Sequence, residues 1–402
     1  MNFKNLSDPV WISENISDLG GPVTSVNLTP LLGSGGLNNA MHVLTVTVSD
    51  TTETKQTDKR FIVKSTASEA ASLSLAQHLG LAREAFFLLS PNGRIPAKHL
   101  PQVKFAHGDM VTGEKIIIMD ELSSHIQSGY LFGKCSPHNW AKDLESVTGI
   151  PEGPQRQEMT RRVTRHAFEA AAKVHAAFWK DRTILDRSWM RASDWMQGEG
   201  QASWEAAQKA ATDCWAEATK KIAEGQSSIQ WNPKLLQCMD ASFAKISWQE
   251  YRRKVMDPDH VFTLVHGDYH PANMMWKFGK DGEDEDSLII LDWEVVGFGS
   301  GPQDCAQYLI SHMYPHEQRM WEGELIQAYH SMLVQSGVDQ STYPLDHCKK
   351  DFVSGGIARW VWLFAHLAAK CPDDWVKYFH DQLAAFIEDH HITPDNIEMP
   401  RV

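Results

Sequence analysis

The chain changes character near residue 122, and this change most constrains the fold. Before it, short runs of β-branched and apolar residues alternate with glycine turns, as in 31–48 and 60–64. After it, apolar residues recur at helical spacing with charges on the opposite face, first over 155–180 and again over 202–223. We therefore expect an α+β protein with a small antiparallel sheet in its N-terminal part and a larger, mainly helical C-terminal part.

The N-terminal part contains a predicted hairpin, then two helical patterns separated by Gly80, then two more strand patterns. These last strands cover 103–109 and 114–122, and no strand pattern follows directly. The sequence thus predicts a boundary between an N-terminal lobe, 1–122, and a C-terminal lobe, 123–402.

Composition excludes several classes of protein. The hydrophobic share of 42% is enough for a sizeable core, while the net charge of −13 argues against binding to nucleic acid or to an anionic membrane surface. Six scattered cysteines show no spacing typical of structural zinc or of a disulfide framework. We see no signal-peptide run and no stretch of about 18 apolar residues, so we expect a cytoplasmic protein without membrane insertion.

The residues most typical of an enzyme lie in 264–276 and 288–294. Asp268 ends an apolar strand pattern, Asn273 follows five positions later, and Asp292 ends a further apolar strand. In kinases the pattern Asp-x4-Asn forms the catalytic loop, where the aspartate orients the acceptor hydroxyl and the asparagine holds magnesium. A further aspartate on the next hairpin supplies the second contact to a metal that prefers oxygen ligands.

These segments resemble a known family. HGDYHPAN (266–273) and LDWEVVGFGSGPQDCAQYL (291–309) resemble the aminoglycoside phosphotransferase and choline kinase superfamily, especially its ecdysteroid-kinase-like branch. VHAAFW (174–179) is similar to the helix that precedes the family's catalytic loop, and IIIMDEL (116–122) to the strand and hinge that contact adenine. The resemblance covers about 31–309 and implies a protein-kinase-like, two-lobe fold that uses ATP and Mg²⁺.

The resemblance also implies roles for single residues of the C-terminal lobe. Asp268 would be the catalytic aspartate, and Asn273 and Asp292 would bind magnesium. Glu294, two positions after Asp292, could approach the metal or the acceptor, or could be structural.

Three other residues near the catalytic segment have simpler interpretations. Asp304 follows a glycine and a proline at the start of a helical pattern, so we expect it to cap that helix. His266 and His270 flank the aspartate, but no third imidazole or thiolate stands nearby to complete a zinc site. In the family the first histidine braces the loop.

In the N-terminal lobe, Lys64 ends a strand pattern and is placed like the strand lysine of kinases, which holds the nucleotide phosphates. That lysine pairs with a glutamate on a helix. Glu84 is the candidate for this glutamate, and Glu69 is the competing choice.

The turn GSGGLNN (33–39) could bring backbone amides close to phosphate oxygens because its glycines are unrestricted. It resembles the family's GG-x-S-N, with Asn38 where serine is usual. The nucleotide-binding residues predicted from the turn, the lysine and glutamate pair and the hinge are Gly33, Gly35, Gly36, Asn39, Lys64, Glu84, Asp120 and Leu122.

An aromatic-rich helical pattern over 355–370 bears on the acceptor. Trp360 and Phe364 lie one turn apart, and Trp362 lies on another face. In choline kinases a tryptophan-bearing helix helps to form a cage for a quaternary amine. Packing in the core is the favoured role of these aromatic residues here. A choline- or ethanolamine-type amino-alcohol kinase is therefore kept only as an alternative.

The predicted activity is transfer of the γ-phosphoryl group of ATP to a hydroxyl of a small molecule. A protein kinase is disfavoured, because only about eleven positions separate Asp292 from the next helix and no DFG or APE motif is present. A non-catalytic, nucleotide-binding pseudokinase is the alternative from another class. The joint presence of Lys64, Asp268, Asn273 and Asp292 argues against it.

Overall fold

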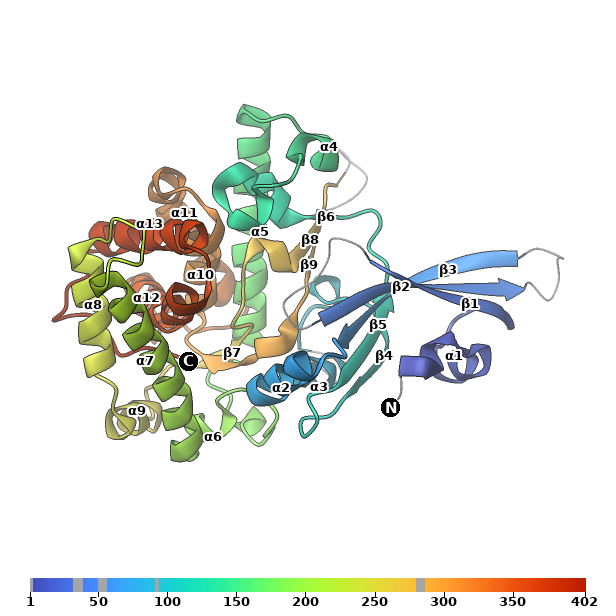
Figure 1. Ribbon diagram of the computed structural model, residues 1–402, viewed down its shortest axis with the longest axis horizontal. Helices are drawn as coiled ribbons and strands as arrows, with labels where there is room; N and C mark the ends of the chain where they lie inside the picture. The colour runs from blue at the N-terminus through green and yellow to red at the C-terminus, as the bar shows by residue number, and fades with distance from the viewer. Residues whose placement is uncertain (1–2, 32–38, 50–55, 91–93, 280–285) are drawn as a thin grey trace. The chain divides into compact units, whose positions relative to one another are not determined.

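The computed structural model describes residues 3–31, 39–49, 56–90, 94–279 and 286–402. These residues form two compact units (Figure 1). Unit 1 comprises residues 1–125 together with 289–296, and unit 2 comprises 126–288 and 297–402. The chain therefore returns once from unit 2 to unit 1. The boundary predicted at residue 122 stays a prediction.

Unit 1 is built on a five-stranded antiparallel sheet. Its strands in spatial order are β1 (Val23–Pro30), β2 (Asn39–Ser49), β3 (Gln56–Thr66), β5 (Lys115–Asp120) and β4 (Val103–Gly108). The predicted hairpin is β2 and β3. The edge strand β1 was not predicted, because its exposed and half-buried residues alternate without a clear apolar face.

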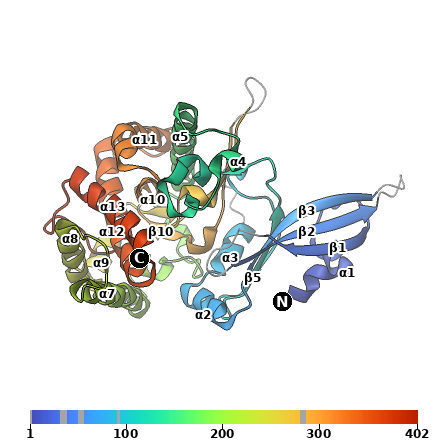
Figure 2. The same cartoon turned by 45° about the horizontal axis from the view of Figure 1, so that its top comes forward.

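Short helices pack on the sheet of unit 1. The helix α1 (Pro9–Asn15) begins with a proline after Asp8, whose side chain accepts a hydrogen bond from the N–H of Val10. The helix lies beside the sheet (Figure 2), and its buried Ile12 belongs to the same hydrophobic cluster as residues of the strands. The helices α2 (Ala70–Leu79) and α3 (Arg83–Leu89) are separated at Gly80, which has the left-handed conformation that favours glycine. The core beneath α1 contains Leu6, Ile12, Ile16, Leu44, Val46, Phe61, Val63 and Ile118.

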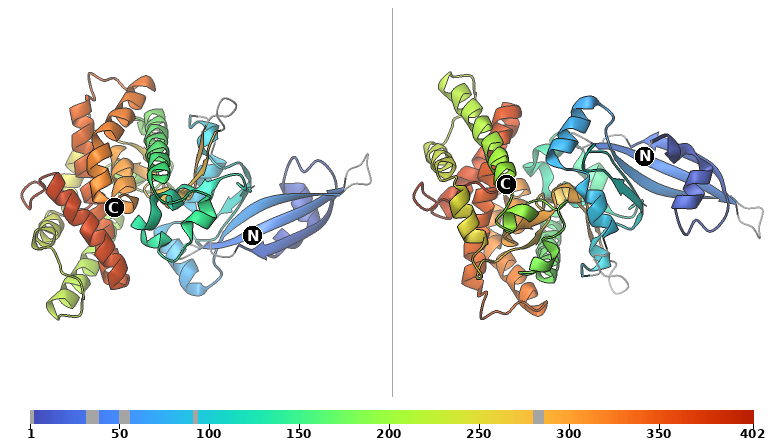
Figure 3. Two further views of the ribbon diagram at one scale, coloured as in Figure 1. Left: turned by 90° about the horizontal axis from the view of Figure 1, so that it is seen from above. Right: turned by 90° about the horizontal axis from the view of Figure 1, so that it is seen from below.

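Unit 2 is mainly helical (Figure 3). Its long helices pack in pairs around α12, which contacts α7 and α10, while α5 packs on α11. The helices are α4 (Leu144–Thr148), α5 (Pro154–Ala177), α6 (Ser193–Met196), α7 (Gln201–Ala223), α8 (Pro233–Ala244), α9 (Trp248–Val255), α10 (Pro302–His312), α11 (Pro315–Gln335), α12 (Leu345–Lys370) and α13 (Asp373–Asp389). Short strands lie in the connections between these helices. The strand β6 (Ile126–Gln127) pairs with β8 (Met274–Lys277), and β7 (Thr263–Val265) pairs with β10 (Gly297–Gly299).

The helix α12 is, among the described residues, the one long and apolar enough to cross a membrane by length and composition. Of its most apolar window, 61% is buried inside the protein, as in the core helix of a globular domain. The helix is long and apolar because other helices surround it.

The predicted α+β fold is confirmed. An N-terminal antiparallel sheet precedes a helical C-terminal region, as expected for a kinase-like protein.

Candidate active site

The strand lysine and helix glutamate lie together in unit 1. Lys64 on β3 pairs with Glu84 on α3, with 2.7 Å between Nζ and Oε2. Both side chains are buried. Glu69 only precedes α2, so the pairing glutamate is Glu84.

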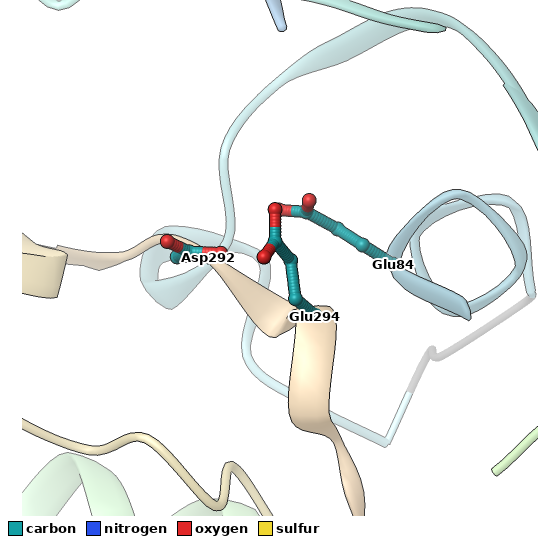
Figure 4. A group of neighbouring side chains, drawn as sticks. All are labelled: Glu84, Asp292 and Glu294. Atoms are coloured by element: carbon teal, nitrogen blue, oxygen red, sulfur yellow. The ribbon is translucent and has the colours of Figure 1, made fainter. Parts of the chain in front are cut away.

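Two further carboxylates, on the segment after β9 (Ser287–Ile290), lie close to the Lys64 ammonium. Asp292 Oδ1 lies 2.7 Å from Lys64 Nζ, and Glu294 Oε1 lies 3.0 Å from it. Asp292 has a φ of 65°, a left-handed conformation that aspartate tolerates better than most residues. Figure 4 shows Glu84 extending from its helix toward Asp292 and Glu294.

Trp293 fixes this turn. Its ring stacks on Phe87 of α3 with 4.4 Å between the centroids. Its N–H donates to Glu84 Oε1 over 3.3 Å. The same helix therefore holds both the glutamate and the turn that carries the other two carboxylates.

Lys115, at the start of β5, completes the cluster and was missed by the sequence analysis. Its Nζ lies 2.8 Å from Glu84 Oε2 and also pairs with Glu294. Asn39 donates a 2.6 Å hydrogen bond from Nδ2 to Glu294 Oε1. A signal was present in the sequence, because a lysine beside the apolar run 116–119 needs a charged partner when its strand is buried.

The charges of this cluster are coupled. Burial lowers the pKa of Lys64, but Asp292, Glu294 and Glu84 outweigh it and leave that pKa well above its usual value. Burial raises the pKa of Glu84 and of Glu294, but both lysines reverse the effect, so both pKa values are lowered, that of Glu294 to about 2. Lys64 is therefore an ammonium group facing the carboxylates of Glu84 and Glu294.

Asp292 differs from the other two carboxylates. Loss of water raises its pKa, Lys64 opposes this, and repulsion from Glu294 and Glu84 adds to it, so that the pKa is raised to about 6. Its side chain is 33% exposed, against 2% for Glu84. Asp292 is thus the carboxylate of the cluster that is most available to a further cation.

The donor set fits magnesium. Within the part of the chain that the structure describes, one group of three or more His, Cys, Asp or Glu side chains brings its ligand atoms within 4.8 Å of one another: Glu84, Asp292 and Glu294. All of its donors are carboxylate oxygens, which Mg²⁺ prefers. His266 and His270 do not belong to this group.

The predicted catalytic loop lies in unit 2, directly after β7. Asp268 Oδ1 accepts a 2.8 Å hydrogen bond from Gln307 Nε2 on α10. Its Oδ2 accepts one of 3.1 Å from Asn273 Nδ2 and lies 3.4 Å from His270 Nε2. The structure therefore brings Asp268 and Asn273 together, as their spacing suggested.

The groups around Asp268 keep it ionised. Loss of water would raise its pKa, but His270, His266 and Arg359 outweigh that effect and leave the pKa lowered. The side chain keeps 40% of its surface exposed. A carboxylate in this state can accept a hydrogen bond from an acceptor hydroxyl.

The loop backbone is held by a buried aspartate. Asp304 accepts hydrogen bonds from the N–H groups of His266 at 2.7 Å and Gly267 at 3.1 Å. Its Oδ2 lies 3.3 Å from Nε2 of His175 on α5. The expectation that Asp304 caps its own helix was wrong: α10 begins after Gly301 and has no side-chain cap. The partners of Asp304 are distant in sequence, so a local pattern could not reveal them.

Two more groups brace the same loop. His266 Nδ1 accepts from the N–H of Asp268 at 3.2 Å, which is the bracing role that the resemblance implies. Arg359 on α12 donates to the Gly267 carbonyl at 3.0 Å. Gln307 and Arg359 were not singled out from the sequence, because nothing local distinguishes them from other helical polar residues.

The remaining predicted nucleotide-binding residues lie at or after the end of β5, or outside the described residues. Asp120 ends β5 and its carboxylate lies 3.3 Å from Lys104 Nζ. Leu122 follows, and its carbonyl accepts from the N–H of His125 at 3.0 Å. Gly33, Gly35 and Gly36 lie outside the described residues. For all of them the role in nucleotide binding stays a prediction.

The aromatic residues of α12 serve packing. Trp360 and Phe364 are fully buried, against Phe379 and Trp231 respectively. The ring of Trp362 is covered by the Arg359 guanidinium at 5.1 Å. These contacts favour the core role over a cage for an amine.

Comparison with known proteins bears on the same region. Residues 153–340 match the model of the ecdysteroid kinase-like family. No curated protein matches the chain. A solved structure of the microcompartment-associated aminopropanol kinase is similar over 91% of this chain and 92% of its own, with 13% sequence identity and a TM-score of 0.38. The residues that match the ecdysteroid kinase-like family, 153–340, carry the candidate catalytic loop.

Proposed function

We propose that the protein is an ATP-dependent phosphotransferase that moves the γ-phosphoryl group to a hydroxyl of a small molecule. One observation supports this most: Lys64 is ion-paired with Glu84 and, in the same cluster, with Asp292. This is the set of groups that kinases use to hold the phosphates and a metal ion. The matching family supports the small-molecule kinase class.

Each unit would supply part of the reaction. In unit 1, Lys64 would bind the α/β-phosphates and Asp292 would hold magnesium. In unit 2, Asp268 would orient the acceptor hydroxyl and accept its proton, and Asn273 would provide a further oxygen ligand to magnesium.

Catalysis would rest on positioning and charge. A loose phosphoryl-transfer transition state leaves little covalent work for the protein. Bound magnesium would neutralise charge on the phosphate oxygens. The network of Gln307, Asn273 and His270 fixes the Asp268 carboxylate, so that its orientation is set before the acceptor arrives.

The test is ATP consumption by the full chain with Mg²⁺ and a library of alcohols that includes amino alcohols, sterols, sugars and hydroxy acids. Acceptor-dependent ADP release, with a phosphorylated product detected by mass spectrometry, is expected for at least one class. Magnesium-dependent nucleotide binding without turnover on any acceptor would instead favour the pseudokinase alternative. Turnover confined to choline or ethanolamine would favour the amino-alcohol kinase.

A variant of Asp292 tests whether this residue holds magnesium. Asp292→Ala removes the most exposed carboxylate of the cluster and should weaken magnesium-dependent nucleotide binding by about tenfold or more. Asp286→Ala is a control on another carboxylate of the preceding hairpin. Unchanged metal dependence in Asp292→Ala would remove Asp292 from the metal site.

A further inference from the structure

We infer that unit 2 holds a second ligand site, which takes a small molecule with a carboxylate on an apolar body. The site is a cavity of about 400 Å³ between α6, α7, α9 and the segment 398–402. Ligand pockets in proteins commonly have this size. The inference does not rest on the proposed phosphotransfer.

One part of the cavity lining is aromatic. Trp204 on α7 faces Tyr251 on α9, with 5.3 Å between the ring centroids. Trp195, Met196 and Phe298 complete this apolar side. Flat rings and a thioether offer surface to an aromatic or aliphatic body of a ligand.

One end of the cavity has a polar group without a partner. Ser300 lines it and is only 8% exposed, yet its hydroxyl has no hydrogen-bond partner among the described residues. A buried hydroxyl left without a partner costs free energy. The hydroxyl has almost no exposed surface in this conformation, so a rotation about χ1 would have to bring it to a ligand acceptor atom in the cavity and thereby remove that cost.

Arg401 adds a weakly paired cation at the same end. The recorded contacts of its guanidinium are 3.6 Å to Glu398 and 3.5 Å to Gln303 Oε1, both at the long limit for such interactions. A Cβ atom on Gly355 would lie 3.5 Å from Ser300 Oγ and 3.6 Å from Arg401 Nη1. The hydroxyl and the guanidinium therefore border one small space beside Gly355.

The other charged groups that line the cavity are already paired. Lys254 binds Glu398 at 2.9 Å and Arg253 binds Glu250 at 2.9 Å. Lys245 donates to three backbone carbonyls of the segment 394–397. Arg401 is the cation left with the weakest partner, so an anion is the favoured ligand group.

The cavity is distinct from the predicted catalytic loop. Gly299 lines it and pairs with Thr263, the first residue of β7. Asp268 follows the opposite end of that strand. Neither Asp268 nor Asn273 is among the residues that line the cavity.

The experiment is isothermal titration of the full chain, without nucleotide, with three probes of equal body: 2-naphthoate, 2-naphthalenemethanol and 2-naphthylmethylamine. We expect 2-naphthoate to bind at least about tenfold more tightly than the other two. Arg401→Gln should weaken 2-naphthoate about tenfold and leave the alcohol unchanged, while Ser300→Ala should weaken it about threefold. Arg319→Gln, which removes an exposed arginine paired with Asp389, is the matched control.

Equal affinity for the three probes, no saturable binding, or unchanged 2-naphthoate binding by Arg401→Gln would each overturn the inference. Melting temperatures without ligand check that the variants fold. If Arg401→Gln does not fold, the variants Ser300→Ala and Arg401→Lys test the inference in its place. Ser300→Ala must still weaken 2-naphthoate, and Arg401→Lys must keep the preference for the anion. The acceptor library plays no part, so failure here is separate from failure of the proposed function.

Discussion

Lys115 donates a 2.8 Å hydrogen bond to Glu84 Oε2 from a side chain that has no exposed surface. Because Lys115 also pairs with Glu294, Lys64 is not the sole cation that compensates these carboxylates. Lys115 is inaccessible to a nucleotide in this arrangement. We therefore regard it as a positioning residue, which keeps Glu84 and Glu294 in place.

Lys115→Met should destabilise the fold by about 3–5 kcal/mol, since removing one partner of a buried ion pair leaves a charge uncompensated. Urea unfolding measures this change. Lys115→Met combined with Glu294→Gln should recover part of the loss, because the unpaired charge is removed as well. A loss below about 1 kcal/mol in the single variant would contradict the assignment.

Asp268→Asn should lower kcat by about 10²–10⁴-fold, the range typical of a positioned acid–base group. Nucleotide affinity should change little, because Asp268 belongs to the acceptor side of the proposed reaction. Steady-state kinetics and nucleotide titration measure both quantities, with Asp213→Asn on the exposed face of α7 as control. A variant that keeps most of its turnover would exclude the catalytic role.

Asp304→Ala should lower kcat and also reduce stability. It leaves the N–H groups of His266 and Gly267 without an acceptor in the interior, at a cost of about 1–3 kcal/mol for each buried group. Asp304→Asn keeps one acceptor oxygen and should recover part of both losses. Full activity in Asp304→Ala would show that the loop does not depend on this brace.

Stability should fall with acidification below about pH 6.5, and His312 should account for part of the slope. Burial lowers its pKa well below the usual value, and His270 and His138 add to this. In the unfolded chain His312 binds a proton near pH 6.5, whereas in the folded protein it stays neutral to a lower pH. Below about pH 6.5 this difference lowers the free energy of unfolding by about 1.4 kcal/mol per pH unit.

Urea unfolding at several pH values from 7.5 to 5 tests this. His312→Gln should flatten the slope, whereas His316→Gln, which changes an exposed histidine, should not. Identical slopes in the wild type and His312→Gln would contradict the prediction.

Sequence reasoning succeeded where the determinants are local. The β2 and β3 hairpin, the helices on either side of Gly80 and the spacing of Asp268 and Asn273 follow from patterns within a few residues. It failed where long-range contacts decide. Asp304 could have capped its own helix, and only the fold shows that it binds the backbone at positions 266 and 267 instead.

The edge strand β1 shows a different cause of failure. Only one of its sides packs, on α1 and β2, so the burial along the strand varies too weakly to give a clear apolar face. Lys115 lay beside an obvious strand, but its partners Glu84 and Glu294 stand 31 and 179 positions away. No local pattern connects residues at such separations.

The return of residues 289–296 to unit 1 has a practical consequence for anyone dissecting this chain. A fragment ending at His125 would keep both buried ammonium groups, Lys64 and Lys115, but only Glu84 of the three carboxylates that surround them. Such a fragment would be expressed with an internal excess of positive charge. The N-terminal part should therefore be insoluble alone unless the octapeptide is grafted back or co-expressed with it.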